Sequence, residues 1–374
     1  MEFIDTFEKH KNESEKSLDD YFKELRLKLG KEMNNKIKIY LDTKYWIYLR
    51  DYIMGRNKDK NIKQIYELLH EGVDKDKLIC PVSDAIFYEI TQQTDSSTLK
   101  ETVALIDSLS KGITIISSIE RIKFEILYFI YSLNGWSNNL YSPDEFVWTK
   151  VSYLLGLTSF ESKLFSREDE RVIQKAFVDQ MWTFSLTDII DKLGMEALLR
   201  MPRINDISKQ LNVDKVKYSH ENNSFKQIFM SEVAGILDVI KPDIQEMLVY
   251  IYKEQFNKEP DATELESFKS EEMFANVIYN VVDSNKIGLY LPTLIIIAKL
   301  HAGVRLDIQR KYRKNDQIDF QHASAALPYF DYFFTERSLM DLIKRKNINL
   351  QNVYHCRVFA RSVEVLESLK SINC

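Results

Sequence analysis

Apolar positions follow two different patterns along this chain, and the change between them divides the sequence. Near the start, short apolar runs typical of buried strands alternate with stretches whose apolar residues recur at helical spacing. The runs at 36–42, 78–82 and 112–117 are predicted strands. A β-α-β-α-β order of this kind predicts a parallel sheet flanked by helices.

From about residue 119 to residue 285 the pattern is almost entirely helical. The predicted helices of this stretch cover 119–133, 144–157, 168–193, 225–256 and 262–284. The α/β pattern then returns, with predicted helices over 292–304, 316–327 and 337–345 and predicted strands over 329–335 and 352–356. The predicted fold class is therefore α/β, a parallel sheet interrupted in the sequence by a large all-α insertion.

The same changes of pattern predict the organisation of the chain. Residues 1–35 form a charged N-terminal helix packed on the main body, and residues 36–120 form the first part of the α/β domain. Residues 121–285 form the helical insertion, and residues 286–374 the second part of the α/β domain. Hydrophobic residues at 45% and charged residues at 29% are typical of a globular protein. The 10 glycines and 7 prolines among 374 residues favour much helix and few long loops.

Net charge and cysteine content indicate which cellular compartment and which binding partners to expect for this protein. The net charge of −5 indicates that any site for a polyanion must be a local basic patch. Cys80, Cys356 and Cys374 have neither CxxC nor zinc-ligand spacing, so we expect free thiols in a reducing compartment. The charged start of the chain and the short apolar stretch 287–298 predict a cytoplasmic protein with no membrane contact.

Acidic residues follow the apolar runs at the points where strands should end. Asp42 follows the first run, Glu89 lies beyond the second, and Glu336 follows the strand predicted at 329–335, while Asp319 lies in the first turn of the helix predicted at 316–327. The carboxyl ends of parallel strands converge on one crevice, so these carboxylates should meet. That much negative charge requires cations, which predicts a divalent-metal site and a metal-dependent hydrolase.

Each carboxylate also has a simpler interpretation. Asp42 could cap the helix that follows it, and Asp316 with Asp319 could satisfy the free amides and the dipole of a helix N-terminus. Glu89 could be a solvated helix position and Glu336 a solvated turn. The metal site is therefore predicted from the joint order of the acids rather than from any one of them.

Four segments resemble those of PIN-domain ribonucleases: 39–47 (IYLDTKYWI), 81–89 (PVSDAIFYE), 319–327 (DFQHASAAL) and 333–336 (FFTE). The resemblance covers roughly residues 36–120 and 290–356. It implies a compact α/β/α domain, Mg²⁺ or Mn²⁺ held by three or four acids, and hydrolysis of RNA or sometimes DNA.

Carried over onto this sequence, the resemblance implies metal ligands at Asp42, Glu89 and Asp319, supported by Asp316. These four and Glu336 are the predicted catalytic residues. The chain departs from the family pattern at Lys44, where the family often has Asn, and at Glu336, since the family usually has Asp one position later. The large helical insertion is a further departure.

Substrate contacts are predicted from hydroxyl and basic residues near these acids. Five positive charges between Arg305 and Lys314 precede Asp316 and could hold phosphates. The predicted substrate-binding residues are Thr43, Lys44, Arg310, Lys311, Arg313, Lys314 and Thr335. His322, one turn after Asp319, is predicted to have a core or surface role.

The resulting function is a metal-dependent endoribonuclease, with a toxin-like or defence role and an insertion that selects RNA or docks a partner. One alternative is a structure-specific DNA nuclease on the same fold, acting on substrates that include single-stranded DNA. Another is a catalytically inactive scaffold that binds a protein partner or a second copy through the insertion. Phosphate-loop, zinc-protease and serine-hydrolase motifs (GxxxxGK[ST], HExxH and GxSxG) are absent from the sequence.

Overall fold

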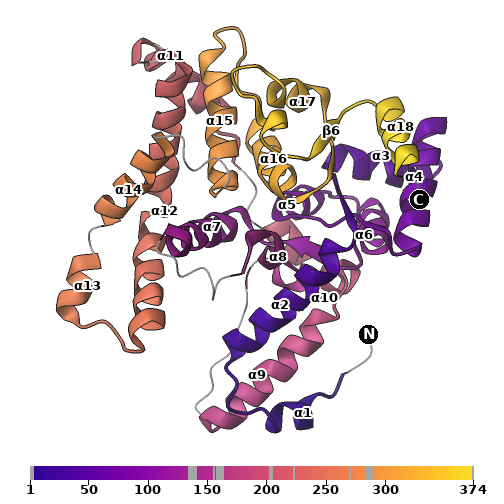
Figure 1. Cartoon of the computed structure of the whole chain (residues 1–374). Coiled ribbons are helices and arrows are strands. Elements are labelled where there is room, and N and C mark those ends of the chain that lie inside the picture. Colours follow the sequence, from indigo (N-terminus) through magenta and orange to yellow (C-terminus); the bar gives the residue numbers. More distant parts are fainter. Residues whose placement is uncertain are drawn as a thin grey trace.

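The computed structural model describes residues 4–133, 141–154, 156, 164–201, 205–221, 224–268, 271–283 and 290–372 (Figure 1). Its centre is a four-stranded parallel sheet with the strand order β2-β1-β5-β6. The strands are β1 (Ile37–Leu41), β2 (Leu78–Ile79), β5 (Tyr332–Phe334) and β6 (Arg357–Phe359). The predicted α/β class with a parallel sheet flanked by helices is confirmed.

Strand β1 lies in the middle of the sheet beside a strand from the far end of the chain. Ile39 is in register with Tyr332, and Leu41 with Phe334. The pairing continues one residue further, because the amide of Asp42 donates to the carbonyl of Phe334 at 3.0 Å. The carboxyl ends of β1 and β5 therefore coincide, although most of the chain separates them in sequence.

Helices that begin directly after strands or short turns surround this sheet. They are α3 (Thr43–Ile53), α4 (Lys60–Asp74), α5 (Asp84–Ile90), α6 (Ser96–Ser110), α16 (Asp316–Tyr329), α17 (Arg337–Ile343) and α18 (Ser362–Ser371). Asp42, Asp59, Ser83 and Asp95 cap the first four, each accepting a backbone amide of the first turn. The main hydrophobic core joins these helices to the strands and includes the fully buried Trp46.

The described part of the N-terminal segment, residues 4–35, packs on the main body as two helices rather than one. These are α1 (Phe7–Lys11) and α2 (Leu18–Asn34). Ser17 caps α2 by accepting the amide of Asp20 at 3.0 Å, which ends the preceding turn. Helix α2 contacts β1 and the helices of the 143–182 region.

The stretch from 121 to 285 is mostly helical and packs in two different places. Its helices, with the two that flank it, are α7 (Ser118–Leu133), α9 (Arg167–Trp182), α10 (Leu186–Arg200), α11 (Ser208–Lys217), α12 (Phe225–Phe256), α13 (Ala262–Phe268), α14 (Glu271–Asp283) and α15 (Pro292–Leu306). Helices α7, α12, α14 and the first part of α15 share a second hydrophobic cluster. Helix α10 instead joins the main core through Leu186, Ile190 and Leu198. Figure 1 shows α11–α14 set apart from the sheet. The predicted boundary at 285/286 lies outside the described residues.

The predicted helix over 144–157 is wrong. A single helical turn, α8 (Pro143–Phe146), is followed by the strand β4 (Trp148–Lys150), which pairs antiparallel with β3 (Ile113–Ile115). A three-residue strand carries too little periodicity to be separated from a helix, and its partner is remote in sequence. The stretch is therefore not entirely helical. A parallel bridge between Val82 and Thr114 connects β3 to the end of β2.

Two other boundaries also differ from the prediction. The last strand is Arg357–Phe359 rather than 352–356, where the chain forms a turn of 3₁₀ helix (Leu350–Asn352) followed by a loop. The predicted helix 168–193 is interrupted after Trp182, because Ser185 and Asp188 form a capping box that starts a new helix.

Two further expectations concern the membrane and the thiols. Within the described ranges, no helix is both long enough and apolar enough to span a bilayer. Cys80 and Cys356 are buried free thiols. Cys374 lies outside the described residues.

Candidate functional site

Asp42 lies at the carboxyl end of β1 and is almost completely buried, with 5% of its surface exposed. Its carboxylate caps α3 by accepting the amide of Tyr45 at 3.3 Å, so the simpler role predicted for this residue is present. Burial raises the pKa of Asp42 to about 6, the nearby charge of Glu336 adds to the increase, and His322 opposes it. A capping role alone does not need a carboxyl that is costly to ionise.

Asp319 lies in the first turn of α16 and faces the same region. Burial raises the pKa of its carboxyl to about 7 against the effect of His322, and the charges of Glu336, Asp42 and Asp316 raise it further. The charges of these three acids therefore act on the carboxyl of Asp319. The convergence of acids from distant parts of the chain remains a prediction, and the effect of Asp42 on the pKa of Asp319 supports it.

Glu336 is the exposed member of the group. It occupies the N-cap position of α17, yet its side chain makes no capping hydrogen bond. Because β5 runs beside β1, Glu336 lies at the same sheet edge as Asp42. Its carboxylate is therefore available to a ligand at the rim of the site.

Glu89 belongs to the site through a buried network rather than as an isolated acid. Its Oε2 lies 2.9 Å from Nε2 of His322 and also accepts a hydrogen bond from Thr43. The other ring nitrogen of His322 is hydrogen-bonded to Tyr40 at 2.7 Å, and Tyr40 to Ser83 at 2.6 Å. The pKa of Glu89 is lowered although burial alone would raise it, because His322 and Thr43 stabilise its charged form.

His322 is the residue whose contribution the sequence analysis underestimated. It is buried, with 2% exposed, and its ring connects α16 to β1 and α5. Burial lowers its pKa, but Glu89 and the charges of Asp42 and Asp319 outweigh burial, so the net pKa is raised. Its position three residues after Asp319 placed it on the same helix face, which was the available signal.

The hydroxyl and lysine residues predicted beside the acids have different environments. Thr43 is committed to Glu89. The hydroxyl of Thr335 is fully buried, lowers the pKa of the Asp42 carboxyl, and has no partner in hydrogen-bond geometry among the described residues. The ammonium of Lys44 lies 5.6 Å from the ring centre of Tyr48, a cation–π arrangement.

Asp316 is occupied by contacts within the chain. One carboxylate oxygen accepts from Arg310 at 3.0 Å and the other from the amide of Arg313 at 3.0 Å. The N-cap of α16 is Asn315, so Asp316 does not have the capping role considered for it. These contacts hold the loop before α16, and they compete with the predicted role of Asp316 in metal binding.

The basic residues before Asp316 are divided between ion pairs and solvent. Arg305 pairs with Glu232 at 2.6 Å, and Arg310 with Asp316. Lys311, Arg313 and Lys314 are exposed. Only these last three, of the five predicted charges, are therefore oriented for contact with a polyanion.

The donor set can be compared with the needs of a metal ion. Within the residues described here, no three or more His, Cys, Asp or Glu side chains are close enough together to hold a metal as they stand. Mg²⁺ typically uses one or two carboxylates and completes its shell with water and substrate phosphate. Asp42 and Asp319 fit that requirement, and the buried hydroxyl of Thr335 acts on the carboxyl of Asp42.

Comparison with protein-family models, curated proteins and solved structures gave no match. The class that the fold defines is a mixed α/β protein with a four-stranded parallel sheet flanked by helices.

Proposed function

We propose that this chain is a metal-dependent phosphodiesterase with a PIN-like catalytic domain, and that its substrate is RNA. The observation that carries the proposal is the placement of Asp42 at the carboxyl end of β1 and of Asp319 in the first turn of α16, where the charge of Asp42 acts on Asp319. They come from opposite parts of the sequence, and the pKa of each carboxyl is raised, to about 6 and about 7. Close carboxylates that resist ionisation are an environment that a divalent cation would stabilise.

The chain's own residues have separable parts in this proposal. Asp42 and Asp319 hold the metal, and Glu336 at the rim orients a water or a second ligand. The Glu89–His322 pair fixes Thr43, which lies next to Asp42. The exposed Lys311 and Arg313 contact the phosphates of the bound strand. A bound Mg²⁺ or Mn²⁺ would lower the pKa of a water and neutralise charge on the phosphate.

The test is cleavage of labelled RNA and single-stranded DNA by the full chain in Mn²⁺ and in EDTA. Asp42→Asn and Asp319→Asn should each reduce cleavage at least about a hundredfold, since they remove ligands of the metal. Asp341→Asn, an exposed carboxylate on α17, is the matched control and should remain active. Cleavage that persists in both site variants would contradict the proposal.

Metal binding needs a readout that does not depend on activity. Mn²⁺ should raise the melting temperature of the wild-type chain and leave that of Asp319→Asn nearly unchanged, because a ligand that binds the folded state stabilises it. Faster cleavage of single-stranded DNA than of RNA would make DNA, and not RNA, the proposed substrate. An absence of both cleavage and Mn²⁺ stabilisation would instead favour a protein-binding scaffold.

A further inference from the structure

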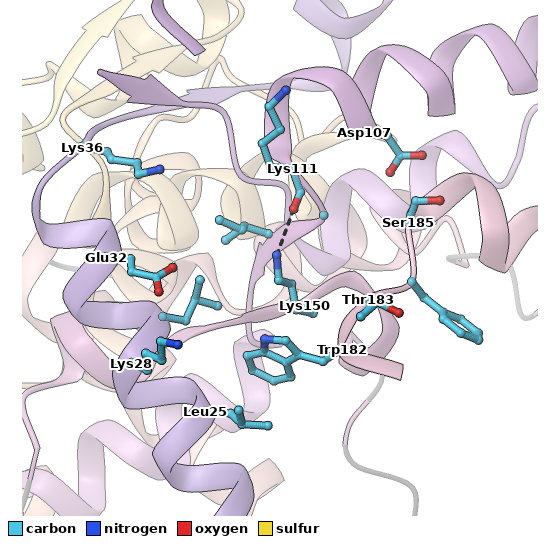
Figure 2. Close-up of a pocket in the computed structure, with 14 residues that line it drawn as sticks. Leu25, Lys28, Glu32, Lys36, Asp107, Lys111, Lys150, Trp182, Thr183 and Ser185 are labelled. Atoms are coloured by element: carbon cyan, nitrogen blue, oxygen red, sulfur yellow. Dashed lines mark hydrogen bonds between the residues drawn. The ribbon is translucent and has the colours of Figure 1, made fainter. Parts of the chain in front are cut away.

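A separate cavity of about 580 Å³ lies where α2, α6, β3, β4 and the α9–α10 turn meet (Figure 2). Its lining includes four lysines, Lys28, Lys36, Lys111 and Lys150, and the ring of Trp182. The volume is within the range of ordinary small-molecule sites. None of the carboxylates of the candidate active site lines it.

This cavity lies at the end of the strands opposite to the end that carries the carboxylates. Lys36 directly precedes β1, and Lys111 directly precedes Gly112 and β3. Lys150 is paired in register with Ile113, at the same end of the β3–β4 ladder. The cavity therefore opens at the amino ends of the strands that run parallel, whereas Asp42 and Glu336 follow the carboxyl ends.

The walls of the cavity are held together before any ligand binds. Asp107 on α6 accepts the amides of Leu186 and Thr187 at 2.7 and 2.8 Å, which fixes the start of α10 against α6. Lys111 and Gly112 both have positive φ, 50° and 67°, and turn the chain sharply from α6 into β3. This turn directs the carbonyl of Lys111 toward the cavity, as Figure 2 shows.

The lysines are the unusual part of the lining. The ammonium of Lys150 donates to the carbonyl of Lys111 at 3.0 Å but forms no ion pair with a carboxylate among the described residues. Burial lowers the pKa of Lys150 and the charge of Glu32 opposes this only in part, so the cavity disfavours the ammonium charge. Lys36 pairs with Asp76, whereas Lys28 and Lys111 are exposed and have no such partner in the described part of the chain.

The acids of the cavity offset these charges only in part, with Glu32 acting on Lys150. Asp107 is committed to the amides of α10, and Glu32 is exposed on α2. Four lysines against Glu32, Asp107 and the Asp76 that pairs with Lys36 leave a local charge of +1 in a chain whose total is −5. A local excess of this sign favours a small anion with several negative charges.

Trp182 supplies an aromatic wall to the same cavity. Its ring is half-buried and packs against Phe22 and Tyr153, with 5.8 Å between ring centres in each case. These contacts fix the indole, so a flat ligand group could stack on it at little cost in conformational entropy. Figure 2 places Trp182 beside Lys150 at the base of the cavity.

We propose that this cavity binds a nucleotide, with its phosphates on Lys150, Lys111 and Lys28 and its base against Trp182. Charge-assisted hydrogen bonds to ammonium groups suit the phosphates, and stacking suits the base. The proposal does not depend on the nuclease proposal, because the two sites share no residue and lie at opposite ends of the strands.

The experiment is isothermal titration of the full chain with ADP, in EDTA so that a metal bridge at the carboxylate site cannot contribute. Inorganic pyrophosphate and adenosine are the two comparison probes, one without a base and one without phosphate. ADP should bind at least about tenfold more tightly than either probe. The absence of binding at about 1 mM ADP, or equal affinities for ADP and pyrophosphate, would overturn the nucleotide assignment.

Variants then locate the site. Lys150→Gln and Trp182→Leu should each weaken ADP binding about tenfold. Lys28 is exposed on α2, so Lys28→Gln keeps the test valid if the variant at the half-buried Lys150 fails to fold. Lys28→Gln should weaken ADP binding about threefold. Lys60→Gln, an exposed lysine at the start of α4, is the matched control. Unchanged ADP affinity in folded Lys28→Gln and Trp182→Leu would place the ligand elsewhere and overturn the proposal.

Discussion

His322 and Glu89 form a partly buried pair that joins two helices from distant parts of the sequence. Nε2 of His322 lies 2.9 Å from Oε2 of Glu89, and α16 is thereby tied to α5. The same ring is hydrogen-bonded to Tyr40 on β1. The pair therefore fixes three elements around the carboxylates, and it provides positive charge next to Asp42 and Asp319.

This pair should make stability depend on pH. The raised pKa of His322 means that its stabilisation is complete below the unfolded value of about 6.5 and is lost as pH rises through the folded value. The lowered pKa of Glu89 means that its stabilisation is present above about 4.5 and is lost in acid. The pair therefore contributes most between about pH 4.5 and 6.5.

We expect His322→Gln to lose roughly 1.5–3 kcal/mol of unfolding free energy at pH 5.5, the range for a hydrogen bond to a charged group. The loss should be smaller at pH 8.5, because the stabilisation that comes from the raised pKa of His322 is lost as pH rises through the folded value. Urea denaturation at both pH values measures the difference. His355→Gln, at an exposed histidine, is the control. A loss that does not change with pH would mean that His322 acts by packing alone.

The Asp316–Arg310 pair gives a second prediction. Both side chains are largely buried, at 3% and 13% exposed, and Asp316 also accepts the amide of Arg313. We expect Asp316→Asn to cost about 3–5 kcal/mol, because an arginine is left in a buried place without its partner. Lys314→Gln, exposed in the same loop, should change stability by less than about 0.5 kcal/mol. Comparable small effects in both variants would contradict the assigned contacts.

The docking of α2 can be tested at Gly30. A Cβ at this position would overlap the carbonyl oxygen of Glu145 in α8. The atoms in the way belong to the backbone of Glu145, so a side-chain rotation cannot relieve the overlap. We expect Gly30→Ala to cost about 1–3 kcal/mol, as overpacked sites do. Gly235→Ala in α12 is the matched control, since nothing lies within 4 Å of its new Cβ. This control should gain up to about 1 kcal/mol from helix propensity. Equal melting temperatures for the two variants would show that α2 does not pack there.

The sequence predicts the sheet and part of the site because their signals are local. A short apolar run ended by Asp42 indicates both a strand and a helix cap, and β1 is found within one residue of the prediction. The carboxyl ends of parallel strands must then meet, which brings Asp42 near Glu336. The apolar run and the residue that ends it are adjacent in the sequence, so they predict the strand without any information on distant contacts.

The remaining features depend on partners that are remote in sequence. Trp148–Lys150 becomes a strand because β3 offers an edge to it. Arg310 reaches the carboxylate of Asp316 and competes with its predicted role. His322 becomes a central residue because Glu89 and Tyr40 converge on it. Composition and periodicity cannot predict such contacts, because contacts between residues that are remote in sequence depend on the tertiary arrangement.

The carboxylates themselves should destabilise the metal-free protein at high pH. The folded pKa values of Asp42 and Asp319 are raised to about 6 and about 7. Their stabilising contribution is thus present below the unfolded pKa of about 3.8 and is lost as pH rises through the folded values. Metal-free protein should therefore become less stable between about pH 4 and pH 7.5 through these two groups.

Asp319→Asn isolates this effect and connects it to metal binding. In EDTA at pH 8 the variant should be more stable than wild type by about 1–3 kcal/mol, because an amide carries no buried charge. At pH 5 the difference should largely disappear. Saturating Mn²⁺ should reverse the order at pH 8, since only wild type gains the binding free energy. Asp341→Asn, exposed on α17, should follow wild type in every condition. A variant less stable than wild type in EDTA would mean that Asp319 supports the fold as a charged group, and the metal assignment would lose its main physical argument.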